Sequence, residues 1–167
     1  MAKLKSSNRA SRYISWIIAS VAAVLLVAVA GAYFFISSQP IIKSSEIKDV
    51  SFPVYSPTKE PKGYELDRSA TQLSKDTFSY TFVSDTDYDG RIVVTLQPVP
   101  SGFDMTKLIG SGTVTTRGTD LGILYDLSTP SKTQYLLKTE ETLIFFTSQD
   151  DVSVEQVASL VDSLVKL

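Results

Sequence analysis

The 167-residue sequence contains no cysteine and no histidine. Disulfides, thiolate zinc sites, cysteine nucleophiles and histidine general bases are therefore excluded. Asn8 is the only asparagine, and its context "NRA" is not a glycosylation acceptor. Carboxylate, hydroxyl and lysine side chains are left as the groups available for chemistry, and the sequence predicts no catalytic residue and no cofactor.

Positive charge is scarce after the first residues of the chain. Residues 1–12 contain four of the 16 basic residues and no acidic one. The other basic residues and all 18 acidic residues lie from Lys43 onward, so this longer part is acidic. Contacts with nucleic-acid phosphates require a positive surface, and nucleic acid is therefore not an expected partner.

A long apolar run separates the basic start from the acidic remainder. Residues 13–36, "YISWIIASVAAVLLVAVAGAYFFI", contain no charged side chain. At about 1.5 Å per residue, a helix of this length spans a hydrocarbon core of roughly 30 Å with some tilt. The positive-inside bias then places residues 1–12 in the cytoplasm and the C-terminal domain outside. We therefore expect a transmembrane helix, a single-pass protein of the cell membrane, and the lipid bilayer as the partner of residues 13–36.

A cleaved signal peptide is the alternative interpretation of the same run. Ala28, Val29 and Ala30 fit the small-residue pattern that precedes a cleavage site. The run is longer than the apolar core of a typical signal peptide, and it continues through residues 34–36. These lengths favour a retained anchor, and cleavage near Ala30 stays as the alternative.

The remainder divides into a predicted tether and a predicted domain. Small, polar and charged residues over 37–52 predict a linker, and the domain is expected over 53–167. In "PVYSPTKEPKGYELD" the prolines favour extended chain and the glycine permits a turn. This stretch resembles the opening motif of a bacterial extracytoplasmic family, domain of unknown function 4367. The resemblance covers about residues 53–167 and implies antiparallel strands followed by a short final helix.

Some relatives in that family are attached to anti-sigma-like proteins, in which a cytoplasmic segment binds a sigma factor. The tail of residues 1–12 is too short to fold into such a segment, so the resemblance does not extend to that role.

Alternating apolar residues predict an antiparallel sheet with one packed face. In "TFSYTFV" and "RIVVTLQ" every second side chain is large and apolar. The segments "TQYLLKT" and "TLIFFTS" flank a charged turn at Glu140 and Glu141, and "GTVTTR" and "LGILYDL" form a weaker pair.

The last residues, "DVSVEQVASLVDSLVKL", predict the helix that covers this sheet. Ser153 is a favourable N-cap, and Gln156 completes a capping box. At 100° per residue one face of the helix is apolar. That face comprises Val154, Val157, Val161, Leu164 and Val165. The predicted fold class is α+β: a small antiparallel sheet covered by a C-terminal helix.

The stretch "SDTDYDG" contains the beginning of a calcium-binding loop. Asp85, Asp87 and Asp89 alternate and a glycine follows, as in the first half of an EF-hand loop. The bidentate glutamate of such a loop is replaced by Leu96, and the stretch connects two predicted strands. Asp-Gly is also a strong hairpin signal. We therefore predict a turn, with these three aspartates as a weak Ca²⁺ candidate and no other metal site.

The remaining patterns suggest no chemistry of their own. Adjacent acids at 140–141 and 150–151 are expected in exposed turns, where neighbouring side chains point apart instead of facing each other across a sugar. The expected role is a non-catalytic extracytoplasmic interaction or sensing domain with an envelope protein as partner. The alternatives are an envelope enzyme acting through carboxylates and a lipid- or glycan-binding module.

Overall fold

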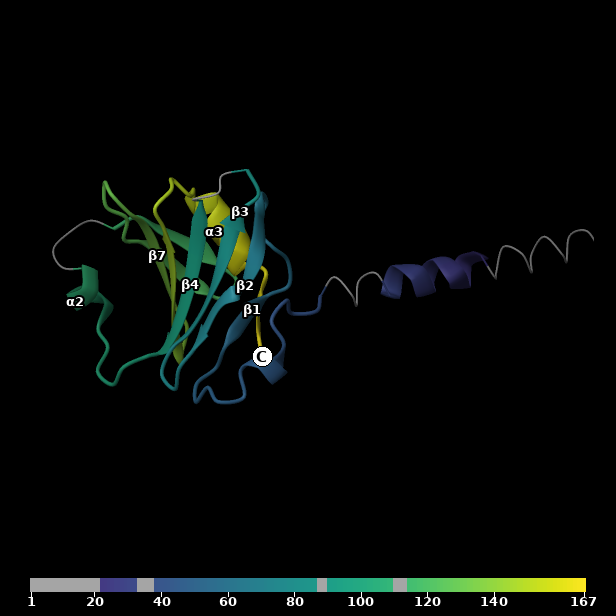
Figure 1. The fold of residues 1–167 in the computed structure, drawn as a ribbon, viewed down its shortest axis with the longest axis horizontal. Coiled ribbons are helices and arrows are strands. Elements are labelled where there is room, and N and C mark those ends of the chain that lie inside the picture. The colour runs from purple at the N-terminus through teal and green to yellow at the C-terminus, as the bar shows by residue number, and fades with distance from the viewer. Residues whose placement is uncertain (1–21, 33–37, 87–89, 110–113) are drawn as a thin grey trace, which may run out of the picture. The chain divides into compact units, whose positions relative to one another are not determined.

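The computed structural model describes residues 22–32, 38–86, 90–109 and 114–167. The chain divides into two compact units, Met1–Gln39 and Pro40–Leu167. In the first unit residues 22–32 are helical, and each of their side chains is exposed (Figure 1). Within the described residues, no helix is both long and apolar enough to cross a membrane. Residues 13–21 and 33–36 of the predicted span lie outside the described ranges.

The second unit is built on a seven-stranded antiparallel sheet with the order β2-β3-β4-β8-β7-β6-β5 (Figure 1). Its strands are β2 (Tyr64–Leu73), β3 (Phe78–Ser84), β4 (Arg91–Pro98), β5 (Thr116–Thr119), β6 (Gly122–Asp126), β7 (Thr133–Lys138) and β8 (Thr142–Ser148). A separate two-stranded sheet pairs β1 (Tyr55–Pro57) with β9 (Leu164–Lys166). Two short helices, η1 (Ser44–Glu46) and α2 (Met105–Ile109), lie in connections.

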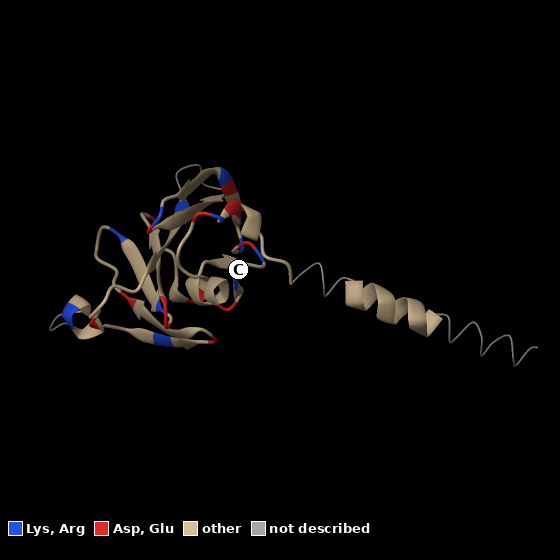
Figure 2. Cartoon of the chain, turned by 90° about the horizontal axis from the view of Figure 1, so that it is seen from below, with Lys and Arg blue, Asp and Glu red and all other residues tan. Residues whose placement is uncertain are grey.

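The strands of the large sheet curve around the helix α3 (Val154–Val161) (Figure 2). Ser153 caps α3, because its side chain accepts a hydrogen bond from the Gln156 N–H while the Gln156 side chain accepts one from the Ser153 N–H. Mostly antiparallel strands with a few helices make an α+β domain, which confirms the predicted class.

The core lies between α3 and the inner face of the sheet. Phe78, Tyr80 and Phe82 of β3 are fully buried, so the alternation seen in the sequence does face the core. They are joined by alternate residues of β4 and by the buried side of α3. These further core residues are Ile92, Val94, Leu96, Val157, Leu160 and Val161. The predicted pairing of β7 with β8 and of β5 with β6 is also confirmed.

The predicted length of the C-terminal helix is wrong. The helix ends at Val161, and the chain then enters β9, in which Val165 pairs with Ser56 and is only half-buried. Leu164 is buried, but as a strand residue. An apolar residue at this position satisfies both the helical and the extended pattern, so the sequence does not reveal the switch.

The compact unit includes most of the segment predicted to be a linker. Ile42 is 1% exposed and Phe52 is also buried. The Ile41 N–H donates to the Pro57 carbonyl at 2.8 Å, and the Ile42 N–H donates to Ser56 Oγ at 2.9 Å. We call residues 40–43 the entry segment. It lies along β1 as part of the domain, which therefore begins at Pro40 and not near Pro53.

Candidate functional site

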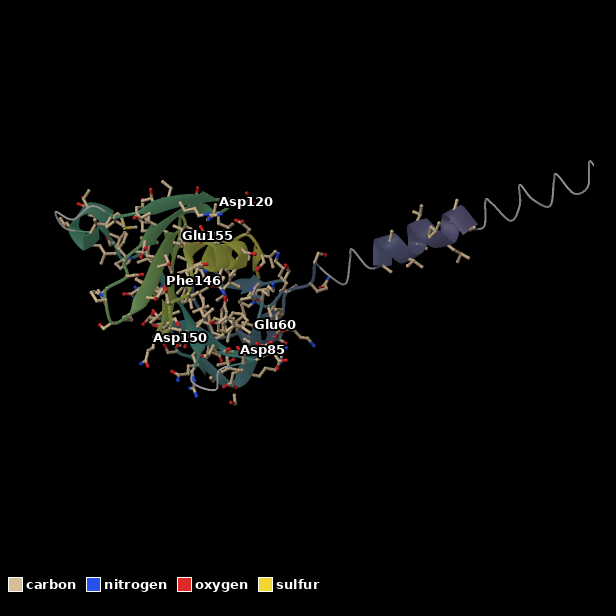
Figure 3. All side chains as sticks on the ribbon, turned by 90° about the horizontal axis from the view of Figure 1, so that it is seen from above. Glu60, Asp85, Asp120, Phe146, Asp150 and Glu155 are labelled. Atoms are coloured by element: carbon tan, nitrogen blue, oxygen red, sulfur yellow. The ribbon has the colours of Figure 1, made fainter. Side chains whose placement is uncertain are left out.

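A cavity of about 340 Å³ lies where the loop after β1 meets the outer side of α3. Its lining residues are Lys59, Glu60, Pro61, Lys62, Glu155, Gln156, Ser159, Leu160 and Ser163. We call this cavity the α3 cleft. Its two walls are held together by Thr58, whose N–H and Oγ1 donate to the Ser163 carbonyl at 2.9 and 3.2 Å. Glu60 and Glu155, one from each wall, are labelled in Figure 3.

Both acidic residues of the cleft are already engaged. Glu60 Oε1 accepts a hydrogen bond from the Leu66 N–H at 3.0 Å, which joins the loop to β2. Glu155 Oε1 lies 3.1 Å from Arg117 Nη1, an ion pair between α3 and the edge strand β5. Each carboxylate therefore has a structural contact within the domain.

Four donor side chains of the cleft are not engaged in this way. Neither Lys59 nor Lys62 forms an ion pair or hydrogen bond with a residue in the described part of the chain. Gln156 uses its side-chain oxygen for the capping box, which leaves its amide hydrogens free, and Ser159 is exposed without a described hydrogen-bond partner. The α3 cleft thus offers donors and positive charge to a ligand.

Of the three aspartates in the weak Ca²⁺ candidate, the structure describes only Asp85. Asp85 is exposed in the connection between β3 and β4, while Asp87 and Asp89 lie outside the described residues. The Ser84 N–H donates to the Gly90 carbonyl at 2.8 Å, which closes the β3–β4 hairpin. Leu96 is completely buried, so it contributes to the core. Within the described ranges no three acidic side chains are grouped in a way that could hold a metal ion.

The adjacent acids lie in turns at two ends of the sheet. Glu140 and Glu141 are exposed between β7 and β8, and Glu141 pairs with Lys166 at 2.9 Å. Asp151 is exposed, whereas Asp150 has one buried carboxylate oxygen, Oδ2, without a hydrogen-bond partner. None of these four acidic residues lines either of the two cavities described in this section.

A second cavity, of about 460 Å³, lies on the outer face of the sheet. It is lined by Arg91 and Val93 of β4 and by Thr147, Ser148 and Gln149 at the end of β8. Arg91 is the only charged residue in this lining, and Val93 pairs directly with Thr147. This cavity offers one charged group, compared with four in the α3 cleft.

Groups with displaced pKa values lie away from the α3 cleft. Hydrogen bonds from Ser69 and Thr106 lower the pKa of the carboxyl groups of Asp67 and Asp104, respectively. Burial raises the pKa of Tyr80 and of Tyr135 in the core. A hydrogen bond to Glu141 raises the pKa of Lys166. None of these five groups lines the cleft.

Sequence patterns do not identify the α3 cleft in advance. Its two walls are about a hundred residues apart in the chain, and the contact between Thr58 and Ser163 brings them together. Each wall belongs to a stretch that stands out in the sequence, residues 53–67 and the C-terminal helix, but no pattern shows that the two meet. No protein-family model, curated protein or solved structure matches this chain.

Proposed function

We propose that this is a single-pass membrane protein whose domain Pro40–Leu167 is a non-catalytic interaction or sensing module outside the cell membrane. The apolar surface of the N-terminal helix is the observation that carries this proposal. Within residues 22–32, five large aliphatic side chains (Val24, Leu25, Leu26, Val27 and Val29) are between 59% and 73% exposed. A helix that is apolar on all sides is stable when a nonpolar medium surrounds it.

The orientation follows from the flanking charges. Basic residues cluster before the apolar run, in residues 1–12, and the domain that follows is acidic. Cytoplasmic flanks of membrane helices are enriched in lysine and arginine, which supports an N-terminus in the cytoplasm. The resemblance of the segment after Pro53 to an extracytoplasmic family agrees with this orientation.

A binding role is supported by the groups that the α3 cleft presents. Its lysines, amide and hydroxyl are donors, and no described group with a displaced pKa lines it. Acid–base catalysis generally uses groups with shifted pKa values, whereas recognition requires only complementary donors and charge.

The absence of cysteine provides a direct test of topology. Single cysteines are introduced by Ser6→Cys in the basic tail and by Ser131→Cys, at an exposed position in the turn between β6 and β7. A membrane-impermeant maleimide should label intact cells carrying Ser131→Cys, and should label Ser6→Cys only after permeabilisation. Labelling of Ser6→Cys in intact cells would contradict the orientation. Release of a soluble, labelled domain into the medium would show cleavage instead of a retained anchor.

A further inference from the structure

The charged side chains that line the α3 cleft differ in whether they have partners within the domain, and this difference indicates which ligands the cleft can bind. The carboxylates of Glu60 and Glu155 each have a partner within the domain, at 3.0 and 3.1 Å. The ammonium groups of Lys59 and Lys62 have none among the described residues. The lining contains two lysines and two glutamates, and Arg117, which pairs with Glu155, lies outside it.

We propose that the α3 cleft binds a carboxylate-bearing peptide segment of a partner protein. This inference rests on the proposed role as an interaction domain and names the chemistry of the partner. A ligand carboxylate accepts from the lysine ammonium groups, and it also accepts from the free amide of Gln156 or the hydroxyl of Ser159. Hydrogen bonds between charged partners are shorter and stronger than those between neutral ones.

The composition of the cleft favours a peptide carboxylate over a phosphate. The planar fork of arginine, which is common in phosphate sites, is absent from the cleft lining, although lysine also binds phosphate. The cleft instead presents two lysines, each of which acts as a point charge on a flexible stem. Pro61 and Leu160 add apolar lining, against which the methylene groups of a peptide side chain can pack. The cavity of about 340 Å³ has the size of a small-ligand site and accommodates a short segment.

Binding is measured with the full chain in nanodiscs of zwitterionic lipid, at low ionic strength. The probe is a short peptide of alternating glutamate and alanine that carries an uncharged fluorophore, and the readout is fluorescence anisotropy. Lys59→Glu combined with Lys62→Glu should weaken binding about tenfold or more, as expected for two charged contacts. The matched control combines Lys75→Glu with Lys107→Glu, at exposed positions outside the cleft, and should change the affinity less than about twofold.

Any of the following results would overturn the proposal. The first is equal weakening by the two double variants, which would show a general effect of net charge. The second is equally tight binding of the same peptide with glutamine in place of glutamate. The third is no binding by the parent, or displacement of the peptide by inorganic phosphate at a lower concentration than by free peptide. The topology test is read on intact cells and this one on purified protein, so either proposal can fail without the other.

Discussion

Tyr80 and Tyr135 show how individual polar atoms are accommodated in this core. Tyr135 is 5% exposed, and its hydroxyl donates to the Val152 carbonyl at 3.0 Å, just before α3. Tyr80 is fully buried, with rings of Phe78 and Phe82 on either side at centroid distances of 5.8 and 5.7 Å. Its hydroxyl lies 3.5 Å from the Tyr55 carbonyl, a long contact. Both phenols are thus held in their neutral form by low-dielectric surroundings.

Tyr80 should make the domain sensitive to alkaline pH. Burial raises its pKa above the ordinary value of about 10, so the folded state keeps the proton that the unfolded state releases. Its contribution to stability is therefore complete below about pH 10 and is lost as the pH rises toward the folded-state pKa. In Tyr80→Phe the free energy of unfolding, measured in urea, should fall less steeply above that pH, by about 1.4 kcal/mol per pH unit. An unchanged slope would mean that Tyr80 ionises freely in the folded domain.

The helix α3 packs against the inner, concave face of the large sheet and so forms one side of the core. Its capping box fixes where it begins, and Val157, Leu160 and Val161 are at most 2% exposed. Ser159, on the other side, is exposed in the α3 cleft. The same helix therefore has a face for the core and a face for the proposed ligand.

Val161→Asp tests whether α3 covers the core. Val161 is completely buried, so the substitution places an unpaired carboxylate among apolar side chains and also removes packing. A change of this kind costs several kcal/mol of a total of about 5–15. The purified chain should therefore lose its cooperative thermal transition. Ser159→Asp, on the exposed face, should melt close to the parent temperature; comparable melting of both variants would show that α3 is not part of the core.

The sequence predicts elements well where one periodicity applies and a local signal marks the boundary. The β3–β4 hairpin has strict alternation and a Gly-containing turn, and α3 has a capping box. The ten-residue strand β2 was not predicted, because it is a polar edge strand with an irregularity between Asp67 and Gln72 and no regular burial alternation. β1 and β9 are too short to show a pattern, and only their mutual pairing makes them strands.

The candidate site was less predictable than the fold. The weak Ca²⁺ candidate at residues 85–89 consists of residues that are neighbours in the sequence, whereas the α3 cleft depends on a contact between Thr58 and Ser163. Free lysines become recognisable as a binding surface only after the partners of the nearby carboxylates are known. Such pairing depends on the tertiary fold and not on local sequence.

For the molecule as a whole, the important boundary is the start of the domain. Pro40 begins the compact unit, and the entry segment contributes the buried Ile42 together with two N–H groups that donate to β1, one to a carbonyl and one to the Ser56 hydroxyl. Three residues, 37–39, therefore separate the end of the proposed membrane segment from the domain.

Two truncated chains distinguish this boundary from the one that composition suggests. Residues 40–167 should fold cooperatively, because they retain the whole core. Residues 53–167 lack Ile42 and Phe52, and loss of large buried side chains costs about 2–5 kcal/mol each. The melting temperature of the shorter chain should be lower by on the order of 10 °C or more. Ile42→Ala within residues 40–167 should reproduce part of this decrease in melting temperature. Equal melting temperatures of the two truncated chains would show that residues 40–52 are a linker, as the composition suggests.

The pairing of β1 with β9 also affects how the domain is made. β9 holds the first strand from the far end of the chain, with the Leu167 N–H donating to the Val54 carbonyl at 2.9 Å, and α3 immediately precedes it. While the ribosome is still making β2 to β8, the large sheet lacks its covering helix and β1 lacks its only strand partner in the described part of the chain. In the topology that we propose, with residues 13–36 as the anchor, this order means that the chain crosses the membrane unfolded and completes its core only after β9 has been made.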